Sequence, residues 1–227
     1  MLSLVEFTGN SNLGVFARAT ETHVLLPHIL PPAQRLDAEQ ALEVKPVVST
    51  IGGTNLLGSL TAANRHGVAL SDIVTAAELR NLERSGLNFA VFEARPNAMG
   101  NNILVTDKGG MCNPAFDDEA VAAFQEFFQV PFVRGTLGGH GTVGMAGIAT
   151  ALGVLVHPKA TPEEREEARR VFGHEAMIGT VNHGMGLVGA GLVANSKGAL
   201  IGRASTAIEI NRIEDALGFL PVPEPRA

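Results

Sequence analysis

The 227-residue sequence contains no Trp, no Tyr and a single cysteine. Without Trp and Tyr the side chains that usually stack on unpaired bases are scarce, so nucleic-acid binding through stacking is disfavoured. One cysteine cannot form an internal disulfide, which suits a reducing compartment. Basic residues are also few, 17 against 23 acidic ones. The resulting net charge of −6 repels phosphate backbones and favours a basic protein surface as the partner.

Long hydrophobic runs are missing as well. Two uncharged stretches, 141–156 and 176–196, are interrupted by glycine or polar turn residues. The first is also shorter than the roughly 20 apolar residues that a membrane-spanning helix needs. The N-terminus has no basic region ahead of Glu6 and does not predict a signal peptide. We therefore expect a cytoplasmic globular protein with no membrane partner.

Glycine, by contrast, is abundant, with 26 residues. Turn signals ending at Gly67, Gly110, Gly153 and Gly198 recur every 43 to 45 residues, and an apolar run follows each of them. Each unit therefore predicts the order strand, glycine bend, strand, tight turn, strand, helix. The five predicted helices cover 37–44, 75–87, 117–128, 161–172 and 205–217.

The two ends of the chain indicate a closed ring. An open stack of repeats needs polar terminal units, but the first strand, 2–7, and the last hairpin, 192–202, are as apolar as the middle ones. The sequence thus predicts an α/β fold of the β/α-propeller type, with five quasi-identical units of about 44 residues around a pseudo-fivefold axis, strands inside and helices outside. The predicted single domain, 1–220, divides at about 1–45, 46–88, 89–130, 131–174 and 175–220, with a short tail at 221–227.

Two segments, GHGTVG at 139–144 and GMGLVG at 184–189, fit the dinucleotide fingerprint G-x-G-x-x-G. The outer glycines recur at 9 and 14 and at 53 and 58 without the middle one, so the repeated element is a bend between two strands. A dinucleotide loop opens directly into a helix, whereas these bends are expected to continue into a strand. We therefore predict no cofactor. An acidic residue follows three of the bends by 20 residues, which we attribute to the same periodicity: Glu78, Glu164 and Glu209.

Catalytic and metal-binding candidates are weak. Cys112 is the only possible thiol nucleophile, but the equivalent positions hold Ala69, Leu155 and Leu200, which indicates a buried apolar slot. The seven histidines show no i, i+4 pair of the kind that binds metal on a helix. The mixed charges of 161–172 are typical of a solvated helix face. We predict neither a catalytic residue nor a metal site.

Polar side chains gather at the bends of the first three units. Loops on a rigid ring are natural binding surfaces, so these residues are candidates for contacts with a partner. The alternative is that asparagine simply tolerates left-handed backbone in bends. The candidates are Asn12, Asn55, Ser59, Asn101 and Asn102.

Five blocks carry a resemblance to a known family: NRHG (64–67), NAMGN (97–101), VLVHPK (154–159), GTVN (179–182) and GLVAN (191–195). With these blocks the chain resembles the translation initiation factor 6 family, and its short tail after Leu220 is closer to the archaeal members. The resemblance implies the five-unit pentein fold and a monomer without catalysis. It also implies binding to the face of the large ribosomal subunit that meets the small subunit, chiefly through a ribosomal protein beside the sarcin-ricin loop. Little direct RNA readout, and no DNA binding, is expected.

The family's residues transfer only in part. An asparagine of the family's A-x-G-N block falls on Asn101, which matches, whereas a family arginine falls on Ser59, which does not. Other proteins of the pentein class are guanidine-modifying enzymes with a Cys, His and acidic triad. An enzyme of this kind using Cys112 is the alternative, although their nucleophile lies late in the chain, where this sequence has no cysteine.

Overall fold

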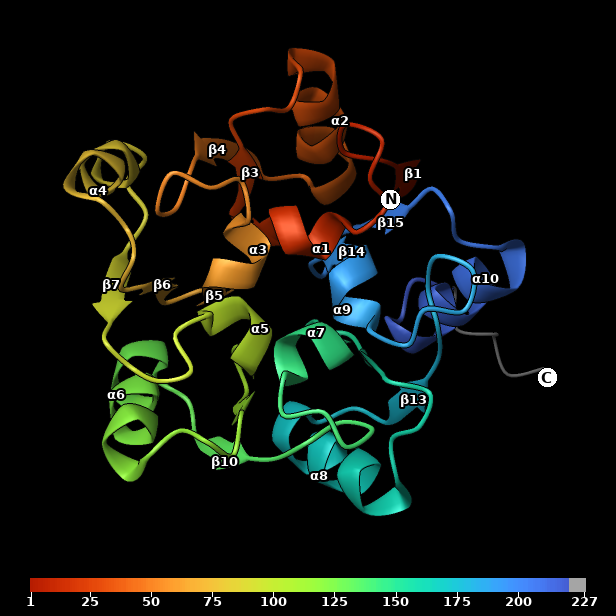
Figure 1. Cartoon of the computed structure of the whole chain (residues 1–227). Coiled ribbons are helices and arrows are strands. Elements are labelled where there is room, and N and C mark those ends of the chain that lie inside the picture. Colours follow the sequence, from red (N-terminus) through yellow and green to blue (C-terminus); the bar gives the residue numbers. More distant parts are fainter. Residues whose placement is uncertain (221–227) are drawn as a thin grey trace, which may run out of the picture.

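Five three-stranded sheets surround a central axis in the computed structural model, which describes residues 1–220 (Figure 1). The predicted tail, 221–227, lies outside the described residues. Each sheet follows the same plan, which confirms the predicted fivefold α/β architecture. The sheets are β2–β3–β4 (Arg18–Ala19, His23–Pro27, Lys45–Ser49), β5–β6–β7 (Thr61–Asn64, Gly67–Ser71, Phe89–Phe92), β8–β9–β10 (Ile103–Val105, Gly110–Cys112, Phe132–Arg134), β11–β12–β13 (Gly147–Ala149, Val154–Val156, Ala176–Ile178) and β14–β15–β1 (Leu192–Ala194, Ala199–Gly202, Leu2–Val5).

Within each sheet the first two strands are antiparallel and the third is parallel to the second. A parallel neighbour requires a crossover, and a helix on the outside of the ring supplies it. The third strand comes from the start of the following predicted unit, so each sheet spans a predicted unit boundary. The outer helices are α2 (Pro32–Leu42), α4 (Ala76–Glu83), α6 (Asp118–Phe128), α8 (Pro162–Phe172) and α10 (Ala207–Ala216).

The first helix begins five residues earlier than the predicted 37–44. Its first turn contains Pro32, and proline is tolerated there because the first N–H groups of a helix have no partner within it. No helix within residues 1–220 combines the length and the apolar composition needed to cross a bilayer.

The innermost elements are five helices of a single turn. The expectation that each glycine bend runs directly into a strand was wrong, because a helical turn of four residues intervenes. Such a turn is too short to show a periodic pattern in sequence. These helices ring the axis in Figure 1 and are α1 (Leu13–Phe16), α3 (Leu57–Leu60), α5 (Met99–Asn102), α7 (Val143–Ala146) and α9 (Val188–Gly191).

A ring of five glycines explains why these helical turns fit around the axis. A Cβ placed on Gly58 would overlap the carbonyl oxygen of Gly14, and one on Gly14 would overlap that of Gly189. The same relation holds around the circle, so any side chain at these positions would push backbone against backbone. We call the five residues the glycine ring: Gly14, Gly58, Gly100, Gly144 and Gly189.

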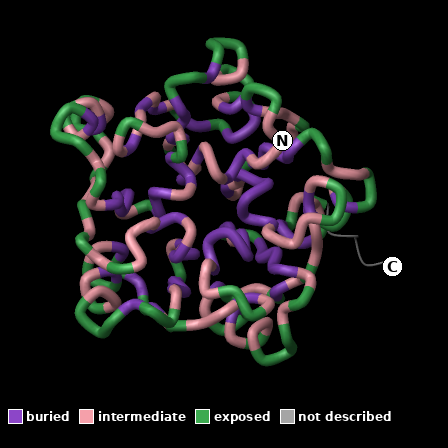
Figure 2. The backbone as a smooth tube through the Cα atoms, in the orientation of Figure 1, coloured by how far each residue is buried: buried purple, intermediate pink, exposed green. Residues whose placement is uncertain are grey.

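The two ends of the chain close the ring. Strand β1 adds to the last hairpin, with residues 2–5 paired in parallel with 199–202. The Asn195 side-chain amide donates to the carbonyls of Thr20 (3.1 Å) and Leu42 (2.9 Å), which ties the fifth unit to the first. The predicted closure is confirmed. Figure 2 shows the buried backbone toward the axis and the exposed backbone on the outer helices.

Candidate functional site

The bends and the one-turn helices together form one end of the ring, which we call the bend face. Four bends are closed by an isolated bridge, between Phe7 and Asn10 and at equivalent places in three other units. In the third unit the corresponding segment is 94–97. The hairpin turns between the first two strands of each unit lie at the opposite end, which we call the turn face.

A carboxylate holds the second bend to its own outer helix. One oxygen of Glu78 accepts from the Thr50 hydroxyl (2.6 Å) and the Gly53 N–H (2.9 Å). The other accepts from the N–H groups of Gly52 (2.9 Å) and Thr75 (2.8 Å). Because Thr75 is the N-cap of α4, the glutamate completes a capping box and fastens the bend with the same group. We call this arrangement a glutamate clamp.

The clamp is repeated in the fourth and fifth units. The clamp explains why an acidic residue follows the second glycine of three bends by 20 positions. From the sequence, this spacing was attributed to the repeat alone. The bend donors, at 2.6 to 3.1 Å, are the Thr136 hydroxyl with the Gly138 and Gly139 N–H groups for Glu164, and the Thr180 hydroxyl with the His183 and Gly184 N–H groups for Glu209.

These hydrogen bonds control the charge of the clamps. Burial alone raises the pKa of Glu78, but the bonds from Thr50, Thr75 and the bend outweigh it and lower the pKa from 4.5 to about 2. The same balance lowers the pKa of Glu209 to about 2 and lowers that of Glu164. The three carboxylates are therefore ionised at neutral pH and act as acceptors only.

The first and third units have no such carboxylate at the equivalent helix position. Gln34 stands there in the first unit, and its Oε1 is buried without a hydrogen-bond partner among residues 1–220. Ala120 stands there in the third unit. A neutral amide or a methyl group cannot bind several N–H groups as a carboxylate does. These two bends must be held in another way.

The preceding unit supplies that hold. In the first unit, Asn182 of the fifth unit donates to the Ser11 carbonyl (2.8 Å) and the Asn12 side-chain oxygen (3.3 Å). In the third unit, Asp72 of the second accepts from the Asn97 amide (2.9 Å) and the Arg95 guanidinium (2.7 Å). The bends at 7–10 and 94–97 are thus fastened across unit boundaries.

All five predicted contact residues lie on or just before α1, α3 and α5, and four of them are partly exposed on the bend face. Asn12 precedes α1, Asn55 lies two residues ahead of α3, Ser59 lies on α3 and Asn101 on α5, and all four are half-buried. The side-chain oxygens of Asn55 and Asn101 are buried without a partner among residues 1–220. The three helical turns are neighbours around the axis (Figure 1).

Asn102 differs from these four and is a correction to the predicted surface set. It is 3% exposed, donates to the Ala98 carbonyl (2.8 Å) and accepts from the Asn113 amide (2.7 Å). Adjacent residues on a single helical turn point in different directions, so Asn101 stays partly exposed while Asn102 is buried. The Asn102 side chain positions α5 and is not open to a partner.

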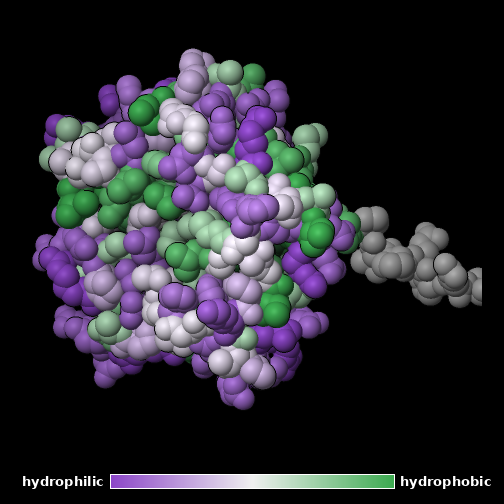
Figure 3. All heavy atoms as spheres, turned by 45° about the vertical axis from the view of Figure 1, so that its right-hand side comes forward, coloured by the Kyte–Doolittle hydropathy of each residue, from purple (hydrophilic) through white to green (hydrophobic). Residues whose placement is uncertain are grey.

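Sequence reasoning missed the apolar side chains beside these residues. Ile29 (55% exposed), Leu56 (40%) and Ile73 (43%) lie at the bend-face end of the first two units. Ile29 and Ile73 occupy equivalent places after the second strand, so their spacing of one repeat was a usable signal. On the side shown in Figure 3, hydrophobic residues form patches separated by hydrophilic ones.

No catalytic or metal centre emerges on this face. His140 and His157 lie with ring centroids 4.8 Å apart, and burial, followed by the nearby charges, lowers the pKa of His157, which is therefore neutral at pH 7. Within residues 1–220 no group of three His, Cys, Asp or Glu side chains is arranged to hold a metal ion.

Cys112 is the last residue of β9 and is buried in the core of the third unit, packed among Ala62, Met99, Phe116 and Phe124. Burial raises the pKa of its thiol to about 11, against a smaller opposing effect of Arg134. Only the thiolate is nucleophilic, and this thiol stays protonated at neutral pH. The alternative of an enzyme that uses Cys112 therefore has no support in the geometry.

Comparison with known proteins gives a consistent result. A profile of the eIF-6 family matches residues 2–216. The protein named translation initiation factor 6 in Methanosarcina mazei is 38% identical over 220 residues, covering 97% of this chain and 100% of its own. Proteins of the same name are 39% identical in Haloquadratum walsbyi, covering 94% of this chain and 95% of that one, and 38% in Archaeoglobus fulgidus, covering 94% and 98%.

Proposed function

The chain belongs to the eIF-6 family of translation initiation factors, and we propose that it binds the large ribosomal subunit with its bend face and blocks joining of the small subunit. It acts as a monomer in the cytoplasm by steric exclusion, without a cofactor and without catalysing a reaction. Its main partner is a ribosomal protein beside the sarcin-ricin loop, with little direct readout of RNA.

The observation that carries the choice of face is the pair of unpartnered amide oxygens on Asn55 and Asn101. Buried polar atoms are nearly always hydrogen-bonded, so an unpaired acceptor marks a place where a donor is missing. Both residues are half-buried on the bend face, so an approaching protein can supply the donors once the amide turns toward it. The proposed contact set is Asn12, Asn55, Ser59 and Asn101.

Two further features favour a protein partner. The exposed apolar side chains Ile29, Leu56 and Ile73 lie at the same end of the ring as these polar residues, and a mixed apolar and polar surface is typical of protein interfaces. The net charge of −6 complements a basic ribosomal protein, which increases the rate of association at low salt. Phosphate backbone would be repelled by the same charge.

Sedimentation with purified subunits tests the proposal. The protein is expected to travel with the large subunit and to reduce the joined ribosome peak when small subunits are added. An Asn101→Lys variant should bind at least tenfold more weakly, because the lysine adds bulk and a positive charge against a basic partner. Asn211→Lys, the same change on the exposed face of α10, should bind like the unaltered protein.

The melting temperature of each variant must match that of the unaltered protein, because only then does weaker binding reflect a lost contact and not a lost fold. A protein that stays at the top of the gradient at low and moderate salt does not bind the subunit, and the proposed function is then wrong. Equal loss of binding in both lysine variants would instead remove the bend face from the proposal.

A further inference from the structure

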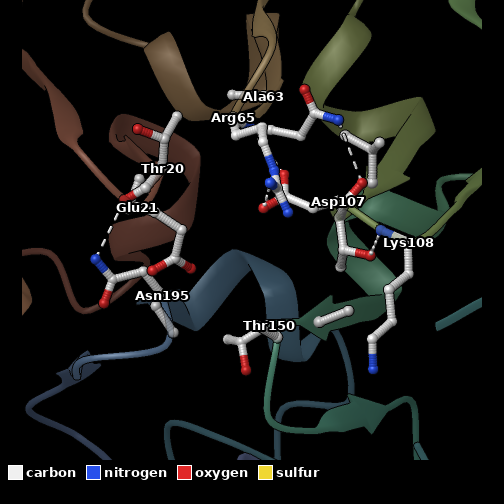
Figure 4. Close-up of a pocket in the computed structure, with 15 residues that line it drawn as sticks. Thr20, Glu21, Ala63, Arg65, Asp107, Lys108, Thr150 and Asn195 are labelled. Carbon is white, nitrogen blue, oxygen red and sulfur yellow. Dashed lines mark hydrogen bonds and ion pairs between the residues drawn. The ribbon is translucent and has the colours of Figure 1, made fainter. Parts of the chain in front are cut away.

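A cavity opens on the turn face along the pseudo-fivefold axis, at the opposite end of the ring from the bend face. Its volume is about 130 Å³, and all five units contribute to its wall (Figure 4). The charged groups at its mouth are two acids and two bases, and Arg65 and Asp107 form an ion pair (3.0 Å). Glu21 accepts from the N–H of Ser196 (3.0 Å) and from its hydroxyl. The mouth is therefore balanced in charge.

A second, deeper chamber of about 40 Å³ continues from this cavity toward the glycine ring. The two spaces share five wall residues, one from each unit, which mark the passage between them: Ala19, Ala63, Val105, Ala149 and Ala194. Since a water molecule requires about 10 to 15 Å³ of such space, the chamber holds about three water-sized groups.

One cation breaks the fivefold pattern of this chamber. Arg18 lies on β2 and pairs with Leu25 of the neighbouring strand. The residues at the same register in the other four units are all apolar: Ala62, Leu104, Ile148 and Val193. Among the described residues, the wall of the deep chamber therefore carries one positive charge, which the repeat does not require.

Among residues 1–220, the Arg18 guanidinium donates only to backbone carbonyls. Its Nε donates to Thr61 (3.1 Å), and its Nη2 donates to Gly58 (2.7 Å) and Gly100 (3.2 Å). Within residues 1–220 no carboxylate lies within ion-pair distance, and Nη1 has no acceptor. Burial lowers the pKa of Arg18 to about 10, so the group is still positively charged at neutral pH.

The backbone of the passage adds further donors. In an antiparallel ladder, alternate residues turn their N–H and C=O groups away from the partner strand. Thr106, Thr150 and Asn195 each donate across their hairpin to Gly109, Gly153 and Gly198, so the residue before each of them points both its N–H and its C=O away from the partner strand and toward the axis. These preceding residues are the alanines and valine of the passage.

A cation in a narrow interior space is costly without a compensating negative charge. The mouth groups neutralise one another, and the carbonyls satisfy only part of the guanidinium. We propose that the deep chamber binds a monovalent anion of halide size, held by Nη1 of Arg18 and the inward N–H groups of the passage. The chamber is too small for a nucleotide, and this site is independent of the proposed ribosomal contact.

Bromide diffraction tests the proposal directly, because bromide is a halide with an anomalous signal. Crystals of the full chain soaked in sodium bromide should show an anomalous peak on the axis, within hydrogen-bond distance of Nη1. The peak should persist in Arg65→Gln, which removes a cation from the mouth, and vanish in Arg18→Gln. Absence of the peak in the unaltered protein, or its persistence in Arg18→Gln, overturns the proposal.

A solution measurement covers the case in which Arg18→Gln does not fold. The melting temperature of the unaltered protein, followed at constant ionic strength while chloride replaces gluconate, should rise by a few degrees and saturate. Arg65→Gln should show the same rise. Identical melting temperatures in chloride and gluconate would overturn the proposal without any Arg18 variant.

Discussion

Three bends of the ring are fastened to their own outer helix by a glutamate, whereas the other two are fastened to the preceding unit. Glu78, Glu164 and Glu209 make the first kind of attachment. Asn182 and Asp72 make the second. The comparison shows that the same backbone bend can be held in two ways. A unit can therefore adopt this fold without a glutamate clamp.

The two kinds of attachment have different neighbours. Asn12 and Asn101 follow the two bends that have no clamp, and both belong to the proposed contact set. Asn55 and Ser59 follow a clamped bend. A clamp holds the bend with hydrogen bonds inside one unit. An attachment to the preceding unit instead couples two units at the surface where a partner is proposed to bind.

The largest expected effect comes from removing a clamp. Glu209→Ala leaves the N–H groups of the bend and of the N-cap without their charged acceptor, and should lower the free energy of unfolding by about 3 kcal/mol. The matched change in an unclamped unit, Gln34→Ala, removes a side-chain oxygen that has no partner and should cost less than about 0.5 kcal/mol. Urea denaturation of both variants measures the difference. Equal costs would show that the clamp contributes nothing specific.

Acid should weaken the clamped units next. The pKa of Glu78 and Glu209 is lowered to about 2 in the folded state, below the usual value of the unfolded chain, so their contribution is complete above pH 5 and is lost as the pH falls toward 2. Unfolding free energies measured from pH 7 to pH 2.5 should fall by about 2 kcal/mol for each carboxylate. In Glu209→Gln the fall in unfolding free energy with acid should be smaller by the contribution of this carboxylate. An unchanged fall would show that other groups cause it.

The smallest expected effect is a gain from installing a clamp. Gln34→Glu places a carboxylate opposite the bend at 7–10 and should raise the free energy of unfolding by about 0.5 to 1 kcal/mol. Ala120→Glu is the control, because Pro96 has no N–H to offer in the bend of that unit and Asp117 lies nearby. A gain from both substitutions would indicate a general helix-end effect rather than a clamp.

Much of the ring could be predicted because its signals repeat. Turn glycines, apolar runs and capping residues recur with one period, so each unit supported the assignment of the others. The closed ring was predicted from the apolar sequences at both ends of the chain, and in the structure these ends do pair, as strands β1 and β15. The one-turn helices were not predicted, because a segment of four residues shows no periodicity. They depend on the close approach of neighbouring units at the glycine ring, which exists only when the five units are assembled.

The site was less predictable, since direction cannot be read from spacing. Asn101 and Asn102 are adjacent and chemically identical, yet one is partly exposed and the other is buried. The spacing of Glu78 from its bend was visible, but its meaning depended on hydrogen bonds between segments 25 to 28 residues apart. Arg18 carried no local signal, because nothing in its neighbourhood indicates that β2 lies against an axis.

The pairing of β1 with β15 has a consequence for how the chain is made. The first strand leaves the ribosome at the outset, but the residues it must join follow almost 200 positions later, as the bond from the Met1 amine to the Lys197 carbonyl shows. It stays unpaired through most of translation, and contacts so distant in sequence slow folding. The last sheet is thus assembled only after residues 199–202 have been synthesised, so a product that terminates before them lacks the partner for its own first strand.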